Sequence, residues 1–244
     1  MNNRKIIIVT GGNGIIGKAI VSNLRKFGYV CINADITNKN NISKNLINLD
    51  LSNKESIDFL LEIVIKKYGK IDGLVNAAYP RTDDWSNKFE KINLESWRRN
   101  VDLQLNSLFY ISQKTLIVMR KQKCGSIVNI ASIYGIVAPD FSIYKQTQMT
   151  MPAAYSAIKG AIINFTKYLA SNYGEYNVRI NCVSPGGVFS GENPIFVKNY
   201  IKKVPLKRMA NPNDIAPAIE FLVSDKSTYI TGHNLVIDGG FTII

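Results

Sequence analysis

The stretch KIIIVTGGNGIIG, residues 5–17, decides the fold class of this chain. Its first half is an unbroken apolar run, which is typical of a strand covered on both faces of a parallel sheet. Glycines follow at once, and apolar residues at helical spacing then continue to Gly28, a residue type that often follows a helix C-terminus. A strand, a tight glycine turn and a helix are therefore predicted in direct succession.

The same alternation continues along the whole chain. Further strands are predicted at residues 29–35, at 48–52, where NLDLS closes a short strand, and at 71–78, 125–132, 178–184 and 233–240. Helices are predicted at residues 53–69, 94–121, 154–172, 194–203 and 213–224. We detect no linker, repeat or low-complexity segment. The pattern predicts one doubly wound α/β domain over residues 1–244, with helices on both faces of a mainly parallel sheet.

Hydrophobicity and cysteine usage exclude several classes of protein. No apolar run approaches the roughly 20 residues that cross a bilayer, and the N-terminus lacks the apolar core of a signal peptide. A cytoplasmic protein is therefore expected. Cys31, Cys124 and Cys182 are widely spaced and suit small buried apolar residues rather than a disulfide framework. With a single histidine in the chain, no metal site is expected.

The formal net charge of +12 raises the question of a nucleic-acid partner. The basic residues are spread along the chain and no nucleic-acid-binding motif is visible, so no such partner is expected. Part of the positive excess suits a substrate that carries phosphate or carboxylate.

The turn TGGNGIIG, residues 10–17, has the spacing of a dinucleotide-binding site. Gly12, Gly14 and Gly17 satisfy G-x-G-x-x-G, and Gly11 with the last two satisfies G-x-x-G-x-x-G. Glycines here let the backbone approach a diphosphate closely, and the helix N-terminus supplies N–H groups. The spacing alone is a weak signal, but between this strand and this helix it predicts nucleotide binding.

Asp35 ends the second predicted strand. A carboxylate at this point can accept both hydroxyls of an adenosine ribose and repels a 2′-phosphate. Ile36 follows it rather than a cation, although Lys39 is near in the sequence. NAD is therefore the expected cofactor and NADP the less favoured one, with a merely turn-forming aspartate as the structural alternative.

Six motifs occur in the order and at the spacing of the short-chain dehydrogenase/reductase family. They are TGGNGIIG, NAA at 76–78, the serine of NIAS at 132, YSAIK at 155–159, SPGGV at 184–188 and YITGHNLVIDGG at 229–240. The chain resembles this family from Lys5 to Gly240. The resemblance implies a seven-stranded Rossmann-like sheet and a nicotinamide-dependent oxidoreductase acting on an alcohol or ketone. It also implies a homodimer or homotetramer built through the long helices of the fourth and fifth crossovers.

The resemblance assigns catalytic roles to Ser132, Tyr155 and Lys159, and the last two are also expected to contact the cofactor. The other expected cofactor contacts come from the glycine turn and from the ends of later strands: Gly11, Asn13, Gly14, Ile15, Ile16, Asp35, Asp50, Leu51, Asn76, Ala77, Ala78, Pro185, Gly186, Val188 and Ser190. Ala78 stands where the family usually has glycine.

The pair Tyr155 and Lys159 can also be understood from chemistry alone. Residues four apart lie on one face of a helix, so both can reach one ligand. A free tyrosine has a pKa of about 10 and is a poor base at neutral pH. A neighbouring ammonium and a positive nicotinamide ring are expected to lower the pKa of Tyr155, so that its phenolate can accept a hydroxyl proton. Ser132 is expected to bind the substrate oxygen, and Lys159 the nicotinamide ribose.

One departure from the family pattern concerns the proton relay. The family has an asparagine in the long fourth helix that completes a relay through water to the lysine. Here that position falls on Gln104, which keeps the amide on a longer side chain, and Asn100 or Asn106 would replace it if the register slips.

A second departure is the gap between Ser132 and Tyr155, which is longer than usual. The extra segment lies within VAPDFSIYKQTQMTMPA, residues 137–153. Its aromatic, Met, Gln and Thr residues suit a wall around a polar, sugar-like substrate, and Lys145 suits an anionic group. A surface insertion or subunit contact is the alternative. Together with SPGGVFSGENP, residues 184–194, it resembles oxidoreductases of the family from bacterial surface-glycan and flagellin-sugar pathways, including those of acidic nine-carbon sugars.

The leading hypothesis is an active NAD-dependent enzyme. Gln104 motivates one alternative, a catalytically altered member that serves as a cofactor-binding regulatory or partner subunit, and the charge alone motivates a nucleic-acid-binding protein. A second Tyr-x-x-x-Lys pair, Tyr110 and Lys114 in YISQK, lies in the preceding long helix and is expected to serve packing or a subunit interface. His233 is expected to be structural.

Overall fold

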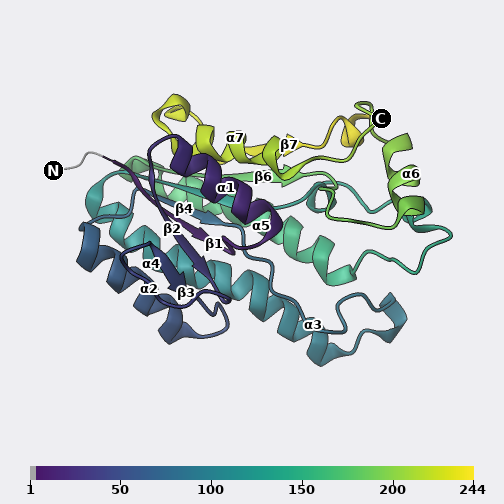
Figure 1. Cartoon of the computed structure of the whole chain (residues 1–244), viewed down its shortest axis with the longest axis horizontal. Helices are drawn as coiled ribbons and strands as arrows, with labels where there is room; N and C mark the ends of the chain where they lie inside the picture. Colours follow the sequence, from purple (N-terminus) through teal and green to yellow (C-terminus); the bar gives the residue numbers. More distant parts are fainter. Residues whose placement is uncertain (1–3) are drawn as a thin grey trace.

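A seven-stranded parallel sheet forms the centre of the molecule (Figure 1). The computed structural model describes residues 4–244, so the first three residues of the predicted domain lie outside it. The strands are β1 (Ile6–Thr10), β2 (Val30–Asp35), β3 (Leu46–Asn48), β4 (Gly73–Asn76), β5 (Gly125–Ile130), β6 (Val178–Pro185) and β7 (Asn234–Ile237). They pair in the order β3-β2-β1-β4-β5-β6-β7, which confirms the predicted fold class. The order reverses between β1 and β4, and open α/β sheets bind ligands beyond the carboxyl ends of the strands at such a point.

Helices cover both faces of the sheet (Figure 1). One face is covered by α1 (Ile15–Lys26) and α7 (Pro212–Val223). The other is covered by α2 (Lys54–Tyr68), α4 (Ser107–Gln122) and α5 (Ala153–Tyr173). The remaining helices are α3 (Leu94–Val101), which leads into α4, and α6 (Pro194–Lys202), which follows β6 beyond its carboxyl end.

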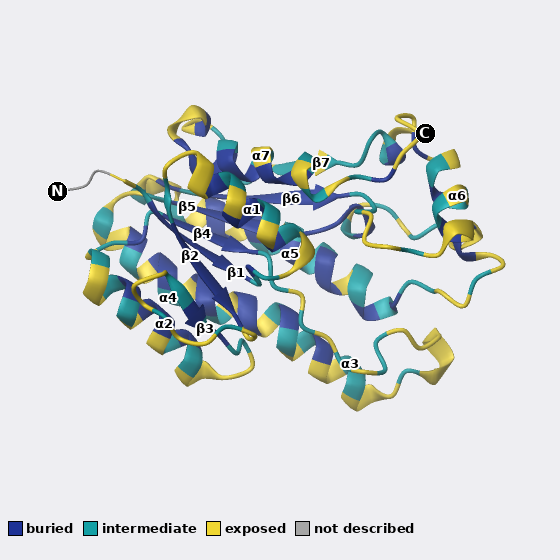
Figure 2. Cartoon of the chain, in the orientation of Figure 1, coloured by how far each residue is buried: buried dark blue, intermediate teal, exposed yellow. Residues whose placement is uncertain are grey.

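The opening strand shows why the sequence folds in this way. Ile6 and Ile8 pack into the core beneath α2, α4 and α5, whereas Ile7 and Val9 pack beneath α1 and α7. All four are at most 4% exposed, and the central strands β1, β4, β5 and β6 are among the most deeply buried parts of the chain (Figure 2). Each such side chain contributes about 1.5–3 kcal/mol when buried, so an unbroken apolar run is stable only between two helical layers.

The third strand is shorter than predicted, because it ends at Asn48 rather than at Ser52. The carboxylate of Asp50 accepts hydrogen bonds from the backbone N–H and the hydroxyl of Ser52, at 2.8 and 2.7 Å. A local turn of this kind competes with strand pairing. Asn53 then caps α2 by accepting a hydrogen bond from the Ser56 N–H at 3.0 Å. Asp50 therefore lies in a loop at the carboxyl edge of the sheet.

The long helix predicted at 94–121 is present, but it contains a change of pitch. Between α3 and α4 the chain makes a π-helical turn at Asp102–Asn106, which the sequence pattern did not indicate. π-helical turns are rare and often occur at functional sites. This one contains Gln104, the residue for which the sequence departs from its family pattern.

Cys31 and Cys182 are buried, but Cys124 is exposed in the turn between α4 and β5, so the prediction of three buried cysteines is wrong for Cys124. Between residues 4 and 244, no helix is long and apolar enough to cross a membrane. The same part of the chain contains no group of three or more His, Cys, Asp or Glu side chains that could hold a metal ion.

Candidate active site

Two adjoining cavities open at the carboxyl edge of the sheet. The large cavity, about 820 Å³, lies against the glycine turn, and the small cavity, about 270 Å³, lies against Tyr155. The two cavities share a wall formed by Ile16, Ala77, Ala78, Tyr79 and Val188. One elongated ligand can therefore extend from the large cavity into the small one.

Most of the predicted cofactor contacts line the large cavity. They come from the glycine turn and from the loops after β2, β3, β4 and β6: Gly11, Gly14, Ile15, Ile16, Asp35, Asp50, Leu51, Ala77, Ala78, Val188 and Ser190. Pro185 and Gly186 line the small cavity instead. Gly11 has φ +65°, and a Cβ at this position would lie 2.5 Å from the Cα of Ala78. Glycine is therefore required where the ends of β1 and β4 meet.

Two predicted contacts, Asn13 and Asn76, do not line the large cavity. The Asn13 carboxamide donates hydrogen bonds to Thr37 Oγ1 and Asn38 Oδ1, at 2.8 and 2.9 Å. The buried Asn76 carboxamide donates to Asn129 Oδ1 at 2.8 Å. Amides that are wholly or partly buried need such partners, so these two side chains organise the loops and strands around the cavity.

The large cavity fits an adenine dinucleotide. The first turn of α1 has neither a side-chain cap nor an acidic residue, so its free N–H groups can bind a diphosphate. Asp35 is 8% exposed, and its carboxylate accepts hydrogen bonds from Asn13 N at 3.0 Å and from Thr37 N and Oγ1 at 2.9 and 2.7 Å. A carboxylate has about four acceptor positions, so Asp35 keeps acceptor capacity for ribose hydroxyls.

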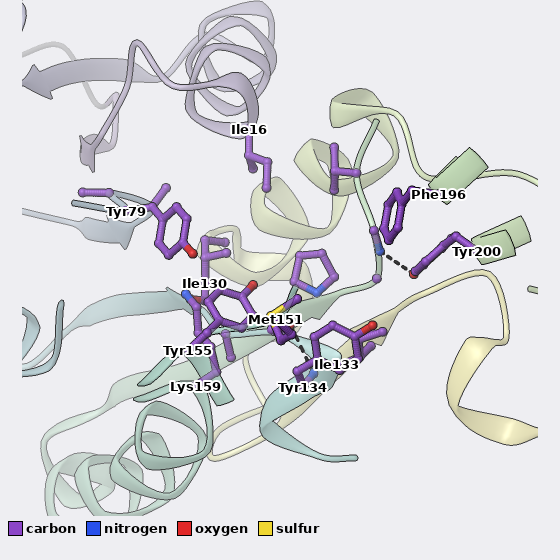
Figure 3. Close-up of a pocket in the computed structure, with 18 of the residues that line it drawn as sticks. Ile16, Tyr79, Ile130, Ile133, Tyr134, Met151, Tyr155, Lys159, Phe196 and Tyr200 are labelled. Atoms are coloured by element: carbon purple, nitrogen blue, oxygen red, sulfur yellow. Dashed lines mark hydrogen bonds between the residues drawn. The ribbon is translucent and has the colours of Figure 1, made fainter. Parts of the chain in front are cut away.

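The structure brings Ser132, Tyr155 and Lys159 together in the small cavity, and Figure 3 shows Tyr155 beside Lys159. Ser132 follows β5, and the other two lie in the first turns of α5. The Lys159 Nζ lies 5.6 Å from the centre of the Tyr155 ring and donates a hydrogen bond to the Ile130 carbonyl at 2.8 Å. The Ser132 Oγ accepts a hydrogen bond from the Tyr134 N–H at 3.2 Å. This bond does not use the hydroxyl proton of Ser132, which can be donated to another acceptor such as the Tyr155 phenol oxygen or a substrate oxygen.

Gly135 permits the close packing that aligns these groups. It ends the short 3₁₀ helix Ile133–Gly135, which follows Ser132 and packs against α5. A Cβ at position 135 would lie 2.6 Å from the backbone carbonyl carbon of Lys159. Any larger residue would therefore push Ser132 away from the helix that holds Tyr155.

Burial controls the electrostatics of the pair. Burial raises the pKa of the Tyr155 phenol, and a hydrogen bond with Ser132 opposes this shift. Burial also lowers the pKa of Lys159 from 10.5 to about 8. Both shifts have one cause, since loss of water disfavours the charged form of each group. The polypeptide alone therefore does not lower the pKa of Tyr155, and the expected lowering depends on the positive charge of a bound nicotinamide ring.

Gln104 lies next to Lys159, as the predicted register requires. It is 6% exposed, and neither polar atom of its carboxamide has a hydrogen-bond partner among the described residues. Both residues line a third cavity of about 20 Å³, which has room for about one water molecule. Asn100 donates a hydrogen bond to Thr82, and Asn106 is exposed, so neither takes the place of Gln104.

The remaining wall of the small cavity is largely aromatic, and the sequence had not singled out Tyr79, Tyr134, Phe196 or Tyr200. The available signals were weak: Tyr79 directly follows NAA, and Tyr134 stands two positions after Ser132. The long segment before α5 contributes two residues to the cavity wall, Tyr144 and Met151. Both also belong to the apolar cluster that contains Ile133. Its Lys145 is exposed and does not line the cavity.

Three other residues considered from the sequence lie outside both cavities. Tyr110 and Lys114 are on α4, away from the carboxyl-edge loops. His233 is exposed, and its backbone N–H donates a hydrogen bond to Asn181 Oδ1 at 3.0 Å, which fits the expected structural role.

Known proteins resemble the chain over nearly its whole length. A family model described as enoyl-(acyl carrier protein) reductase matches residues 13–242. The post-translational flagellin modification protein A of Campylobacter coli is 34% identical over 99% of both chains. A 7alpha-hydroxysteroid dehydrogenase of Bacteroides fragilis is 31% identical, with 98% of this chain and 95% of that protein covered. The crystal structure of a short chain dehydrogenase from Leptospira borgpetersenii with bound NAD+ matches with a TM-score of 0.89 and 35% identity, covering 98% of this chain and 93% of that one.

Proposed function

The chain belongs to the short-chain dehydrogenase/reductase family of oxidoreductases, and we propose that it uses NAD(H) to interconvert a secondary alcohol and a ketone. The observation behind this proposal is the convergence of Ser132, Tyr155 and Lys159 in a small cavity. That cavity shares a wall with a large one that fits a dinucleotide. A proton-transferring group and a hydride acceptor can therefore reach the same substrate carbon and its oxygen.

Tyr155 is the proposed general acid/base. Bound NAD supplies the hydride acceptor and a positively charged ring. The Tyr155 phenolate accepts the hydroxyl proton of the alcohol, and in the reverse direction the phenol returns it. Ser132 donates its free hydroxyl proton to the same substrate oxygen. Because burial raises the pKa of Tyr155, positive charge at the site is needed to form the phenolate at working pH.

Lys159 supplies part of that charge and is also proposed to bind the nicotinamide ribose. We further propose that one water molecule in the third cavity joins Lys159 to Gln104. Such a water would satisfy the buried carboxamide of Gln104. Gln104 would then be a positioning residue that connects the ammonium to a proton relay.

NAD is proposed in preference to NADP. The Asp35 carboxylate lines the large cavity, followed by Ile36, whereas Lys39 is exposed and does not line it. A 2′-phosphate would meet the negative charge of Asp35 without a nearby lysine to neutralise it. The NAD+ in the Leptospira borgpetersenii dehydrogenase supports this choice.

An activated or acidic sugar of bacterial surface-glycan biosynthesis is the proposed substrate class. The flagellin modification protein among the relatives supports this class. The aromatic wall of the small cavity supports it as well, because the apolar faces of sugar rings pack on aromatic side chains. A hydroxysteroid dehydrogenase at similar identity makes a compact apolar alcohol the competing substrate class.

We also propose a cytoplasmic homodimer or homotetramer that assembles through α4 and α5. Phe109 and Ile117 on α4 are 46% and 48% exposed, and Tyr168 on α5 is 63% exposed. Large apolar side chains gathered on two helices are typical of a subunit interface.

Substitution of Tyr155 by phenylalanine tests the function. Turnover of alcohols or ketones by Y155F is expected to fall by about 10²–10⁴-fold, the usual contribution of a general acid/base. NADH binding, followed by fluorescence, is expected to remain, because the substitution removes only one hydroxyl. Tyr110→Phe, which removes the same atom from α4, is the matched control. Undiminished turnover by Y155F would show that another group transfers the proton.

A further inference from the structure

The small cavity offers a substrate one kind of polar contact beyond the three proposed reacting side chains. Among residues 4–244, Lys159 is the single charged residue that lines it. The other lining residues whose side chains carry a hydroxyl are Tyr79, Tyr134, Tyr144 and Tyr200. A charged substrate group buried here without a partner is strongly disfavoured. Because Lys159 Nζ already bonds to the Ile130 carbonyl and is proposed to bind the nicotinamide ribose, it is not available to such a group, and the part of the substrate that enters this cavity is expected to be uncharged.

One of these phenols, Tyr134, has an unused hydroxyl. Its side chain is 7% exposed, and its hydroxyl oxygen has no hydrogen-bond partner among the described residues. Buried polar groups are nearly always paired, because leaving one unpaired has a free-energy cost. Burial, together with the neighbouring Tyr144, raises the pKa of Tyr134. The hydroxyl is therefore protonated at neutral pH and available as a donor.

Tyr200 provides the contrast within the same wall. It is 2% exposed and lines the same cavity, but its hydroxyl accepts a hydrogen bond from the Gly187 N–H at 2.5 Å. Of the three buried tyrosines that line this cavity, Tyr134, Tyr144 and Tyr200, the protein pairs the hydroxyl of Tyr200 with a backbone N–H and leaves that of Tyr134 without a partner among the described residues. Tyr200 positions the turn after β6, whereas Tyr134 has no such task.

The backbone and ring of Tyr134 are firmly placed near the reacting groups. Its N–H is bonded to Ser132 Oγ, and its ring packs edge-on against Phe241, with the ring centres 6.4 Å apart. Met151 packs against the same cluster and also lines the cavity (Figure 3). A methionine side chain adapts easily to a ligand, so this part of the cavity wall can adjust when a substrate binds.

We infer that Tyr134 is a specificity-determining residue whose hydroxyl donates a hydrogen bond to a second, uncharged oxygen of the substrate. This inference rests on the proposed function, in which Ser132 and Tyr155 contact the reacting oxygen. A site built to bind a substrate hydroxyl discriminates against analogues that lack it. Any phosphate or carboxylate of the substrate then lies outside the small cavity, where Lys145 is exposed.

The first test needs no substrate and compares the melting temperatures of Y134F and Y200F. Removing an unpaired buried hydroxyl relieves its desolvation, so Y134F is expected to raise Tm by about 2–4 °C. Removing the paired hydroxyl of Tyr200 is expected to lower Tm by a similar amount. A fall in Tm for Y134F, like that of Y200F, would mean that Tyr134 is a structural tyrosine and would overturn the inference.

The second test measures NAD-linked turnover of neutral sugars, sugar nucleotides and their deoxy analogues. For the best hydroxylated substrate, Y134F is expected to raise KM about tenfold with little change in kcat. For the analogue that lacks the second oxygen, wild type and Y134F are expected to be equal. An unchanged KM, or an equal effect on both substrates, would overturn the inference. No turnover of any alcohol by the wild type would contradict the proposed function. The melting temperatures would then show by themselves whether the Tyr134 hydroxyl is unpaired or structural.

Discussion

Two Tyr-x-x-x-Lys pairs with the same spacing lie in entirely different surroundings. Tyr155 and Lys159 on α5 face the small cavity, where Lys159 is 6% exposed and its Nζ bonds only to a backbone carbonyl. Tyr110 and Lys114 on α4 lie beside α2, and the Lys114 side chain is 37% exposed. The spacing is the same in both pairs, so the surroundings alone distinguish them.

A carboxylate neutralises the pair on α4. The Tyr110 hydroxyl donates hydrogen bonds to both carboxylate oxygens of Asp58, at 2.9 and 3.0 Å, and Lys114 Nζ lies 3.6 Å from the same group. A hydrogen bond from Lys54, followed by those from Tyr110 and the charge of Lys114, lowers the pKa of Asp58. The pair thus joins α2 to α4, which fits the packing role predicted for it.

The pair on α5 has no such counter-ion. Its ammonium lies among aromatic rings, 5.6 Å from the ring centres of both Tyr79 and Tyr155. A buried titratable pair with shifted pKa values in a cavity is typical of a functional site. The pair proposed to react therefore differs from the other in lacking a carboxylate partner among the described residues and in being shielded from water, and this contrast can be tested at several points.

The largest expected effect is on turnover. Lys159→Met removes the positive charge beside Tyr155 and is expected to reduce kcat/KM by about 10²–10⁴-fold, as loss of acid/base catalysis does. Lys114→Met is the matched control and is expected to keep kcat/KM within about twofold, since surface ion pairs contribute little. Equal losses in steady-state assays of the two variants would mean that the pairs do not differ in function.

The next effect is on the pH dependence of stability. Because burial lowers the pKa of Lys159 from 10.5 to about 8, the unfolded chain binds this proton more tightly than the folded one. Below pH 8 the buried ammonium therefore destabilises the fold by about 3 kcal/mol. This destabilisation disappears as pH rises from about 8 to about 10.5, because Lys159 is then neutral in the unfolded chain as well. The free energy of unfolding of the wild type therefore rises relative to that of K159M over this range. Urea unfolding at pH 7, 8.5 and 10 measures the difference, and a constant difference would contradict the burial of a charged group.

The smallest expected effect concerns the pair on α4, Tyr110 and Lys114. Tyr110→Phe removes a hydrogen bond to the Asp58 carboxylate and is expected to lower the free energy of unfolding by about 1 kcal/mol. Because the pKa of Asp58 is lowered in the folded state, this contribution is present at neutral pH and is lost in acid as the carboxylate is protonated. Urea unfolding at pH 7 and pH 3 measures both values. No loss at pH 7 would show that solvent already replaces this bond.

Local sequence patterns predicted the fold well because strand burial and helix periodicity leave direct traces in the order of apolar residues. The boundaries were less predictable. The turn formed by Asp50 and Ser52 ends β3 early through side-chain bonds that no periodicity shows. The π-helical turn around Gln104 likewise changes one turn of an otherwise regular helical pattern.

The proposed reacting residues could be found because each stands in a short motif at the end of a predicted element. The residues that form the walls of the small cavity could not be found in this way. Tyr200 arrives from α6, and Met151 from the long segment before α5, so only folding brings them beside Ser132. Asn13 and Asn76 lie outside the large cavity for a related reason, because they bond to side chains that are distant in sequence.

The sequence by itself determined the strand–turn–helix order and the glycine turn, since these depend on neighbours along the chain, and its resemblance to a family singled out Ser132, Tyr155 and Lys159 as the candidate group. The tertiary structure decided which Tyr–Lys pair faces a cavity, which pKa values shift, and that Tyr134 keeps an unused hydroxyl. Those properties depend on burial and on whether a hydrogen-bonding or ion-pairing group lies nearby. Both are decided only when segments distant in the sequence pack together.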